Sequence, residues 1–208
     1  MNKTIFLNAG HHTEDPGAIF GEYIERDLTI ILRDGLVPLL KEQGFKVEKC
    51  PDNLNLKDSI KWNRENSSDI NDGLALSLHF NASGGKGAET FYYPGNEFSK
   101  NIAKNLLDEY CKKTKLKSRG AKPDTKALHG SLGWIRRTRT WATLIEVAFI
   151  DNIDDMTYVI EHIPEVLEGL CKGVCKAFSV IYQVPQENDL KKQIKKKMKE
   201  LDNLINLI

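Results

Sequence analysis

The sequence predicts a single α/β domain in which a mostly parallel or mixed central sheet carries helices on both faces. Short β-branched or apolar runs alternate along the chain with longer amphipathic stretches, which is the pattern of strands covered by helices. The 208 residues suffice for one sizeable core but not for two ordinary domains joined by linkers. With 40% hydrophobic and 28% charged residues, the composition is that of a globular protein and excludes a disordered or fibrous one.

The first part of the chain is predicted to form two strand–helix units. The apolar run 4–7 is a candidate buried strand, and residues 45–47 give a second strand. Between them, residues 24–40 form the first helix, which Gly44 ends. The apolar stripe of this helix consists of Leu28, Ile31, Leu32, Leu36 and Leu39. Residues 56–66 follow as a second helix with a solvated face.

The middle of the chain is predicted to contain two further strands, a helix and a loop. Residues 74–80 alternate like a central strand, and residues 88–93 are rich in Thr and aromatic side chains. These two strands could pair as a hairpin. Residues 97–111 form an amphipathic helix, whereas the polar, basic segment 112–128, which contains Gly120, is predicted to be a surface loop.

The last strand and the last helix of the domain are followed by a separate tail. Residues 143–147 form that strand and residues 163–181 a long helix, so the compact domain is expected to span residues 1–184. Residues 185–208 are predicted to form an amphipathic helix with an apolar stripe of Leu190, Ile194, Met198, Leu201, Ile205 and Ile208. This stripe would pack on its own domain, pair two copies as a homodimer, or dock on another molecule.

Charge and the length of the apolar runs exclude several classes of partner. Thirty Lys and Arg against 29 Asp and Glu leave a net charge of +1, so no overall field attracts nucleic acid or an anionic membrane. No run approaches the roughly 18 to 20 apolar residues of a membrane span, and the run 4–7 is too short for a signal peptide. We therefore expect a protein made in the cytoplasm without a signal peptide and without a membrane-spanning segment. The four scattered cysteines fit free thiols better than disulfides.

Two of the five histidines, His11 and His79, stand at the ends of predicted strands. The carboxyl ends of parallel strands form a common crevice, so these two imidazoles could face each other there. Catalytic zinc commonly takes three His or carboxylate ligands and leaves one position to water. Glu25, at the start of the first helix, is preferred over Glu22 as the third ligand. His12 is excluded because adjacent residues on an extended backbone point in opposite directions.

A further carboxylate, Glu146, lies within an otherwise apolar strand. Burying an unpaired carboxylate is costly, so its position indicates a specific purpose. Burial would raise its pKa, which suits a general base acting on zinc-bound water, and the two features together indicate a hydrolase. By contrast, Cys171 and Cys175 share a helical face without a nearby His and are expected to pack in the core. His129 and His162 are assigned no function.

The region around His11 and Glu25 carries two short motifs. A strand ending in Gly-His at residues 10–11 is followed by Asp-Pro-Gly-Ala at residues 15–18. Gly21 then precedes Glu-Arg-Asp-Leu at residues 25–28.

Two further motifs follow in the strands that carry His79 and Glu146. Residues 77–82 read Ser-Leu-His-Phe-Asn-Ala, with Gly-Ala-Glu after them at 87–89, and residues 146–152 read Glu-Val-Ala-Phe-Ile-Asp-Asn. Any one motif is a weak signal, but the four in this order resemble the zinc-dependent N-acetylmuramoyl-L-alanine amidases of autolysins, spore-lytic enzymes and phage endolysins. The resemblance covers about residues 3 to 180. His12 departs from it, because a small glycine is usual at that position.

The resemblance implies a function and a role for each matched residue. The expected reaction is zinc-dependent hydrolysis of the amide between N-acetylmuramic acid and L-alanine in bacterial peptidoglycan, which lyses the cell wall. Glu146 would be the catalytic base, and Asn81 and Arg136 are candidate substrate contacts. The Zn²⁺ ligands would be His11, Glu25 and His79.

Alternative functions remain open at this point. Spacing argues for zinc hydrolysis but does not select the substrate, so a zinc peptidase acting on stem peptides is the nearest rival. A wall-binding module without turnover and an assembly protein working through its tail are the others. A wall-directed enzyme without a signal peptide would reach its substrate after lysis or release through a holin.

Overall fold

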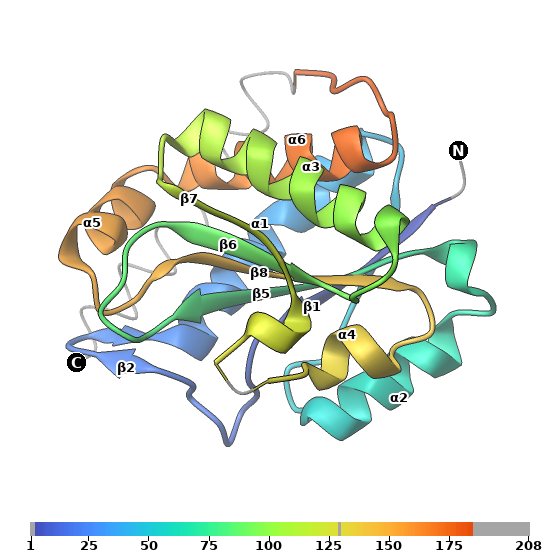
Figure 1. The fold of residues 1–208 in the computed structure, drawn as a ribbon, viewed down its shortest axis with the longest axis horizontal. Helices are drawn as coiled ribbons and strands as arrows, with labels where there is room; N and C mark the ends of the chain where they lie inside the picture. The colour runs from blue at the N-terminus through green and yellow to red at the C-terminus, as the bar shows by residue number, and fades with distance from the viewer. Residues whose placement is uncertain (1–2, 129, 185–208) are drawn as a thin grey trace.

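The computed structural model describes residues 3–128 and 130–184, in which a six-stranded sheet lies between helices (Figure 1). The strand order is β4-β1-β5-β8-β6-β7, and the strands are parallel except that β6 runs antiparallel to β8. The sheet strands are β1 (Thr4–Ala9), β4 (Lys46–Lys49), β5 (Gly73–Asn81), β6 (Ala88–Tyr92), β7 (Ser118–Pro123) and β8 (Trp141–Phe149). The predicted α/β class with a mixed central sheet is confirmed.

Helices cover both faces of this sheet. On one face lie α1 (Glu25–Glu42), α3 (Glu97–Thr114) and α6 (Ile163–Ala177); on the other lie α2 (Leu56–Asn66) and α4 (Gly133–Arg137). Strand β1 shows the division, because Ile5 and Leu7 enter the core under α1 and α6, whereas Phe6 packs with Ile60 of α2 and Trp134 of α4. The two small helices therefore cover only part of their face.

The two long helices α3 and α6 approach closely because α6 carries glycine where they meet. A Cβ at Gly173 would stand 2.7 Å from the Cα and carbonyl oxygen of Leu106, and one at Gly169 would stand 3.2 Å from the Cα of Tyr110. Their buried faces form part of the main hydrophobic core. Glycine is thus required at the contact, although it weakens a helix interior.

Two sequence-based predictions about the sheet are wrong. Strands β5 and β6 do not pair as a hairpin, because β8 lies between them and pairs with both. Strand β8 is largely buried on both faces and so takes a central position, which excludes direct pairing of its two neighbours. The segment 112–128 is not only a loop, since α3 extends to Thr114 and β7 forms the edge of the sheet from Ser118 to Pro123.

Some smaller elements escaped prediction. Helices α4 and α5 (Ile153–Glu161) and the short hairpin of β2 (Ile19–Phe20) and β3 (Tyr23–Ile24) were not expected. Helix α6 ends at Ala177 rather than near residue 181, because Ser179 adopts a left-handed φ of 55°. The predicted tail helix 185–208, with its possible homodimer, lies outside the described residues.

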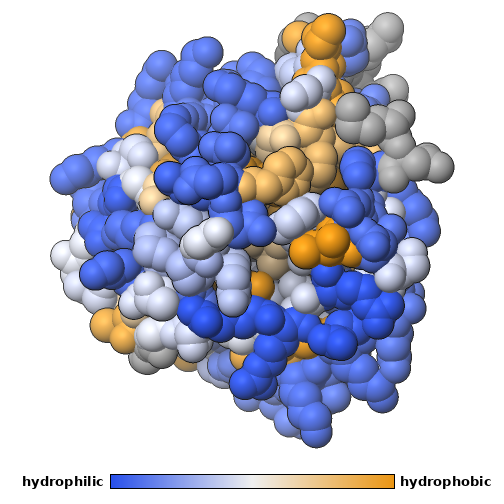
Figure 2. All heavy atoms as spheres, turned by 45° about the vertical axis from the view of Figure 1, so that its right-hand side comes forward, coloured by the Kyte–Doolittle hydropathy of each residue, from blue (hydrophilic) through white to orange (hydrophobic). Residues whose placement is uncertain are grey.

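One face of the surface is largely polar (Figure 2), and the thiols are unpaired. The face drawn in Figure 2 is mostly hydrophilic, with its largest apolar area in the upper part of the view. Among the described residues, no helix combines the length and the apolar composition needed to cross a membrane. All four cysteines are free, as expected, and Cys171 and Cys175 are buried in the main core.

Candidate metal centre and active site

Three side chains from separate elements meet at the carboxyl ends of β1 and β5. His11 follows β1, His79 lies near the end of β5, and Glu25 is the first residue of α1. The Nε2 atom of His11 lies 2.9 Å from Oε2 of Glu25, and Nδ1 of His79 lies 3.0 Å from Oε1 of the same carboxylate. One ligand atom from each residue lies within 4.8 Å of the other two. The three predicted metal ligands are therefore brought together.

Glycines make this close arrangement possible. A Cβ at Gly10 would stand 2.6 Å from the ring of His79, and one at Gly17 would stand 2.5 Å from the ring of His11 and 2.7 Å from Oε2 of Glu25. Gly17 also has a φ of +69°, which side-chain-bearing residues rarely adopt. His11 itself has a φ of 70°, so the backbone turns there and is not extended, contrary to the reason given for excluding His12. Even so, only His11 of the pair joins the cluster.

A second set of contacts orients the cluster. Oδ2 of Asp15 lies 2.9 Å from Nδ1 of His11, and its Oδ1 accepts a hydrogen bond of 3.0 Å from the amide of Gly17. Glu25 accepts hydrogen bonds of 3.0 Å from the backbone amides of Ala18 and Phe80. These contacts fix the direction of an imidazole and a carboxylate before any ion arrives, as is usual around protein metal ions.

The charges in the cluster are strongly coupled. Burial by itself would lower the pKa of His11, but hydrogen bonds and charge interactions with Glu25 and Asp15 outweigh it and raise the pKa to about 9. Burial would raise the pKa of Glu25, yet its contacts with His11 and His79 hold that pKa well below its usual range. The cluster is thus an anionic carboxylate between two imidazoles, and this donor set fits a zinc ion.

Glu146 lies on β8 beside this cluster. Its Cα is paired with that of His79 on β5 and with that of Glu89 on β6. Its Oε2 atom is buried and has no hydrogen-bond partner among the described residues. Burial first, and then the charges of Glu25 and Glu89 against the opposing histidines, raise the pKa of Glu146 to about 7. A carboxyl group with this pKa can accept and return a proton near neutral pH.

Comparison with known proteins assigns the family. The sequence profile of the family described as N-acetylmuramoyl-L-alanine amidase matches residues 5–177. The chain belongs to this amidase family. The resemblance inferred from the four motifs is confirmed, and with it the enzyme class: this amidase is a hydrolase of bacterial peptidoglycan.

Two curated relatives and one solved structure illustrate the relationship. The amidase is 28% identical over 171 residues to the germination-specific N-acetylmuramoyl-L-alanine amidase of Bacillus subtilis (strain 168), covering 74% of this chain and 70% of that protein. It is 28% identical over 162 residues to the endolysin of Bacillus phage SPP1, covering 74% and 58% respectively. The crystal structure of N-acetylmuramoyl-L-alanine amidase from Clostridium difficile 630 superposes with a TM-score of 0.75 at 23% identity, over 86% of this chain and 97% of that one, and shows the same fold.

A cavity of about 410 Å³ opens beside the metal centre of the amidase. His11 and His79 border it, and apolar side chains such as Leu56, Trp134 and Leu144 form much of its wall. His12 also borders this cavity, where its Nδ1 accepts a hydrogen bond of 3.3 Å from the amide of Glu14. The departure from the family pattern at His12 thus places an imidazole at the cavity and outside the cluster of His11, Glu25 and His79.

The remaining predicted residues of the amidase lie at varied places. Asn81 donates a hydrogen bond of 2.9 Å to Oε1 of Glu89, at the far side of Glu146. Arg136 forms two hydrogen bonds of 2.6 and 2.8 Å with the buried Asp124, lies over the ring of Tyr93, and borders a different depression. A substrate contact by Asn81 or Arg136 therefore stays a prediction.

The two histidines that were assigned no function stay apart from the cluster where they are described, and two further carboxylates contribute to the site. His162 stacks on Tyr158, with ring centroids 4.4 Å apart, and His129 lies outside the described residues. Asp15 and Glu89 were missed as contributors. Both stand inside two of the four sequence motifs, so a signal was present, but their contacts depend on a turn and on the strand order of the sheet.

Proposed function

We propose that this amidase cleaves the amide between N-acetylmuramic acid and L-alanine with the help of zinc, and so lyses the bacterial cell wall. The observation that supports the proposal is the placement of the buried, unpartnered carboxyl oxygen of Glu146 beside the cluster of His11, Glu25 and His79. A base without a partner beside a preorganised metal centre is what hydrolysis of an unactivated amide requires.

The three clustered residues would hold the ion through His11 Nε2, a carboxylate oxygen of Glu25 and His79 Nδ1. Zinc bound there supplies a Lewis acid that polarises the scissile carbonyl and makes a water molecule more acidic. Asp15 keeps Nε2 of His11 turned toward Glu25 by occupying Nδ1 of the same ring.

Glu146 carries the proton in the reaction. Its carboxylate accepts a proton from the attacking water, whose oxygen forms a bond to the carbonyl carbon of the lactyl group. The protonated Glu146 then delivers this proton to the nitrogen of L-alanine as the carbon–nitrogen bond breaks. A pKa of about 7 leaves both forms of the group accessible near neutral pH. The products are a free lactyl carboxylate on the glycan and a peptide with a new amino terminus.

The identity of the bond comes from the family, and a peptidase acting on stem peptides would use the same groups. We would incubate purified peptidoglycan with the zinc-loaded wild-type protein and with Glu146→Gln, and identify the new chain ends by mass spectrometry. New L-alanine amino termini on intact glycan strands, reduced roughly 10²- to 10⁴-fold in the variant, are expected.

Other outcomes select other functions. Cuts within the stem peptide would show that the enzyme acts as a peptidase and not on the amide next to N-acetylmuramic acid. Absence of cleavage by the zinc-loaded wild-type protein would leave a wall-binding module. A Glu146→Gln variant with full activity would assign proton transfer to another group. If the variant loses activity, bound zinc measured in both proteins excludes loss of metal as the cause.

A further inference from the structure

The catalytic face of the sheet carries a row of charged side chains that extends beyond Glu146. His79, Glu146 and Glu89 are paired neighbours on β5, β8 and β6, so their side chains project from the same face. Leu144, two residues before Glu146 on β8, borders the cavity beside the metal centre and confirms which face this is. The row leads from the metal ligands toward the edge strand β7.

A bulge in β7 adds two cations to this row. Ser118 pairs with Ala88 and Ala121 with Thr90, so Arg119 and Gly120 together stand opposite the single residue Glu89. Gly120 has a φ of +89°, which permits the extra residue. As a result, Nε of Arg119 donates a hydrogen bond of 3.0 Å to Oε2 of Glu89.

Lys122, two pairs beyond the bulge, also contacts Oε2 of Glu89, and the Arg119 guanidinium lies 4.7 Å from the ring centroid of Phe149. We call Arg119 and Lys122 the cationic edge. Glu89 is 4% exposed, and its other oxygen already accepts the amide of Asn81. Two positive charges therefore face one carboxylate, so Arg119, Lys122 and Glu89 together carry a net charge of +1.

The cationic edge is accessible. The side chains of Arg119 and Lys122 are 32% and 31% exposed, and the terminal guanidinium nitrogens of Arg119 have no hydrogen bond to another described residue. A guanidinium held at Nε with its outer donors free is a suitable receptor for a carboxylate.

The proposed reaction sets the direction in which the substrate lies. Glu146 delivers its proton to the leaving nitrogen, so the peptide begins on the β8 side of the metal centre, while the cavity beside His11 remains for the glycan. Adjacent strands lie about 4.8 Å apart, which places β7 roughly 10 Å beyond β8. An extended peptide covers about 3.3 to 3.6 Å per residue, so the cationic edge lies about three residues from the bond cleaved.

We propose that Arg119 and Lys122 bind a free carboxylate on the second or third residue of the stem peptide and make the enzyme prefer substrates that keep this carboxylate over substrates amidated there. The inference rests on the proposed amidase reaction. It concerns recognition of the leaving peptide and leaves the chemistry at the metal centre unchanged.

The test uses pairs of synthetic muramoyl peptides that differ only in a carboxylate or a carboxamide at the second or the third residue. For the wild-type enzyme, kcat/KM should be about tenfold higher for the carboxylate member of one pair, since a partly exposed charge-assisted hydrogen bond contributes on this order. Arg119→Gln and Lys122→Gln should each reduce this ratio toward one, mainly through KM. Arg119→Lys, which keeps the charge, should retain part of the preference.

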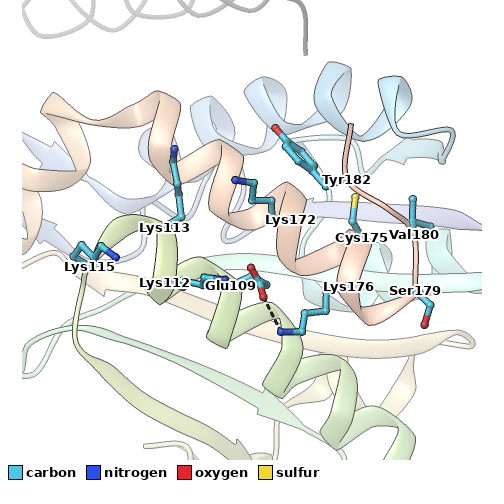
Figure 3. A pocket seen from close by; sticks show the side chains of 10 residues that line it. All are labelled: Glu109, Lys112, Lys113, Lys115, Lys172, Cys175, Lys176, Ser179, Val180 and Tyr182. Atoms are coloured by element: carbon cyan, nitrogen blue, oxygen red, sulfur yellow. Dashed lines mark hydrogen bonds and ion pairs between the residues drawn. The ribbon is translucent and has the colours of Figure 1, made fainter. Parts of the chain in front are cut away.

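A matched control comes from another basic region of the chain. Figure 3 shows a cavity of about 670 Å³ between α3 and α6 that is bordered by Lys112, Lys113, Lys115, Lys172 and Lys176. Lys112 forms no ion pair with a described residue, and Lys112→Gln removes one positive charge without touching the cationic edge. This variant should keep the wild-type ratio.

Each failure has its own signature. Equal kcat/KM for both members of every pair in the wild-type enzyme would overturn carboxylate recognition while the amidase reaction stands. A parallel loss on both members in Arg119→Gln and Lys122→Gln, with the ratio unchanged, would assign these residues only to supporting Glu89. Absence of peptide release from all substrates would instead reject the proposed function itself.

Discussion

At the scale of single residues, the candidate site depends on groups that contact the proposed ligand residues as much as on those residues themselves. Asp15 illustrates this, because its carboxylate holds Nδ1 of His11 and is itself fixed by the amide of Gly17. Without it the imidazole would lose both its orientation and part of its basicity. Removing the carboxylate charge should therefore weaken metal binding without removing a ligand.

We predict that Asp15→Asn lowers zinc affinity roughly 10- to 100-fold, the usual effect of losing such a partner. Competition with a chelator measures the affinity. Asp154→Asn is the matched control, because Asp154 is an exposed carboxylate that pairs with Lys86 away from the cluster. Unchanged affinity in Asp15→Asn would show that the fold alone orients His11.

Residue type and spacing predicted the members of the cluster but not their supporting contacts. His11, Glu25, His79 and Glu146 could be proposed because each stands at a recognisable strand or helix end, or in an apolar run. The contact of Glu89 with Arg119 and Lys122 could not, because it requires the bulge in β7 and the antiparallel placement of β6 beside β8.

At the scale of elements, helix α6 packs directly against the backbone of α3 and not only against its side chains. A methyl group at Gly173 would meet the Cα and carbonyl oxygen of Leu106 at 2.7 Å, and backbone atoms cannot rotate away. Overpacking of this kind costs about 1 to 3 kcal/mol, of which up to roughly 1 kcal/mol is offset by the helix preference of alanine.

Gly173→Ala should therefore lower the free energy of unfolding by about 1 to 2 kcal/mol, measured by urea denaturation at constant m-value. The comparison variant is Gly133→Ala in α4, where the nearest atom, at 3.2 Å, belongs to the flexible side chain of Leu56. A gain in stability from Gly173→Ala would mean that the two helices separate easily.

Elements with a strong apolar periodicity were predicted well from the sequence, but which elements lie beside one another in space was not. Helix α2 spans the predicted residues 56–66, and β5 contains the predicted residues 74–80. Hairpin pairing of β5 with β6 was wrong because pairing depends on which strand must be buried on both faces, and β8 has that need. The strand β7 within the segment 112–128 was not predicted because it lies at the sheet edge, where polar and charged side chains replace apolar ones.

At the scale of the whole molecule, the proposed metal centre should couple protonation, metal binding and folding. In the metal-free protein the pKa of His11 is about 9, whereas its ordinary value is 6.5. Between these two pH values the folded protein holds a proton that the unfolded chain has released. This stabilisation is fully present below about pH 6.5 and is lost as the pH rises through 9. Glu25 stays ionised throughout this window, because its pKa lies below its usual range.

The same proton competes with zinc, because His11 can ligate an ion only in its neutral form. Between pH 6.5 and 8.5, the apparent zinc affinity should rise about tenfold per pH unit and each ion bound should release about one proton. Over this interval Tm should fall in chelator but change less or rise in saturating zinc.

Calorimetry in buffers of different ionisation enthalpy counts the protons, and thermal unfolding with and without zinc gives Tm. His162→Gln, which alters a histidine stacked on Tyr158, should leave both slopes unchanged. Zinc affinity independent of pH would place the proton elsewhere than on a ligand.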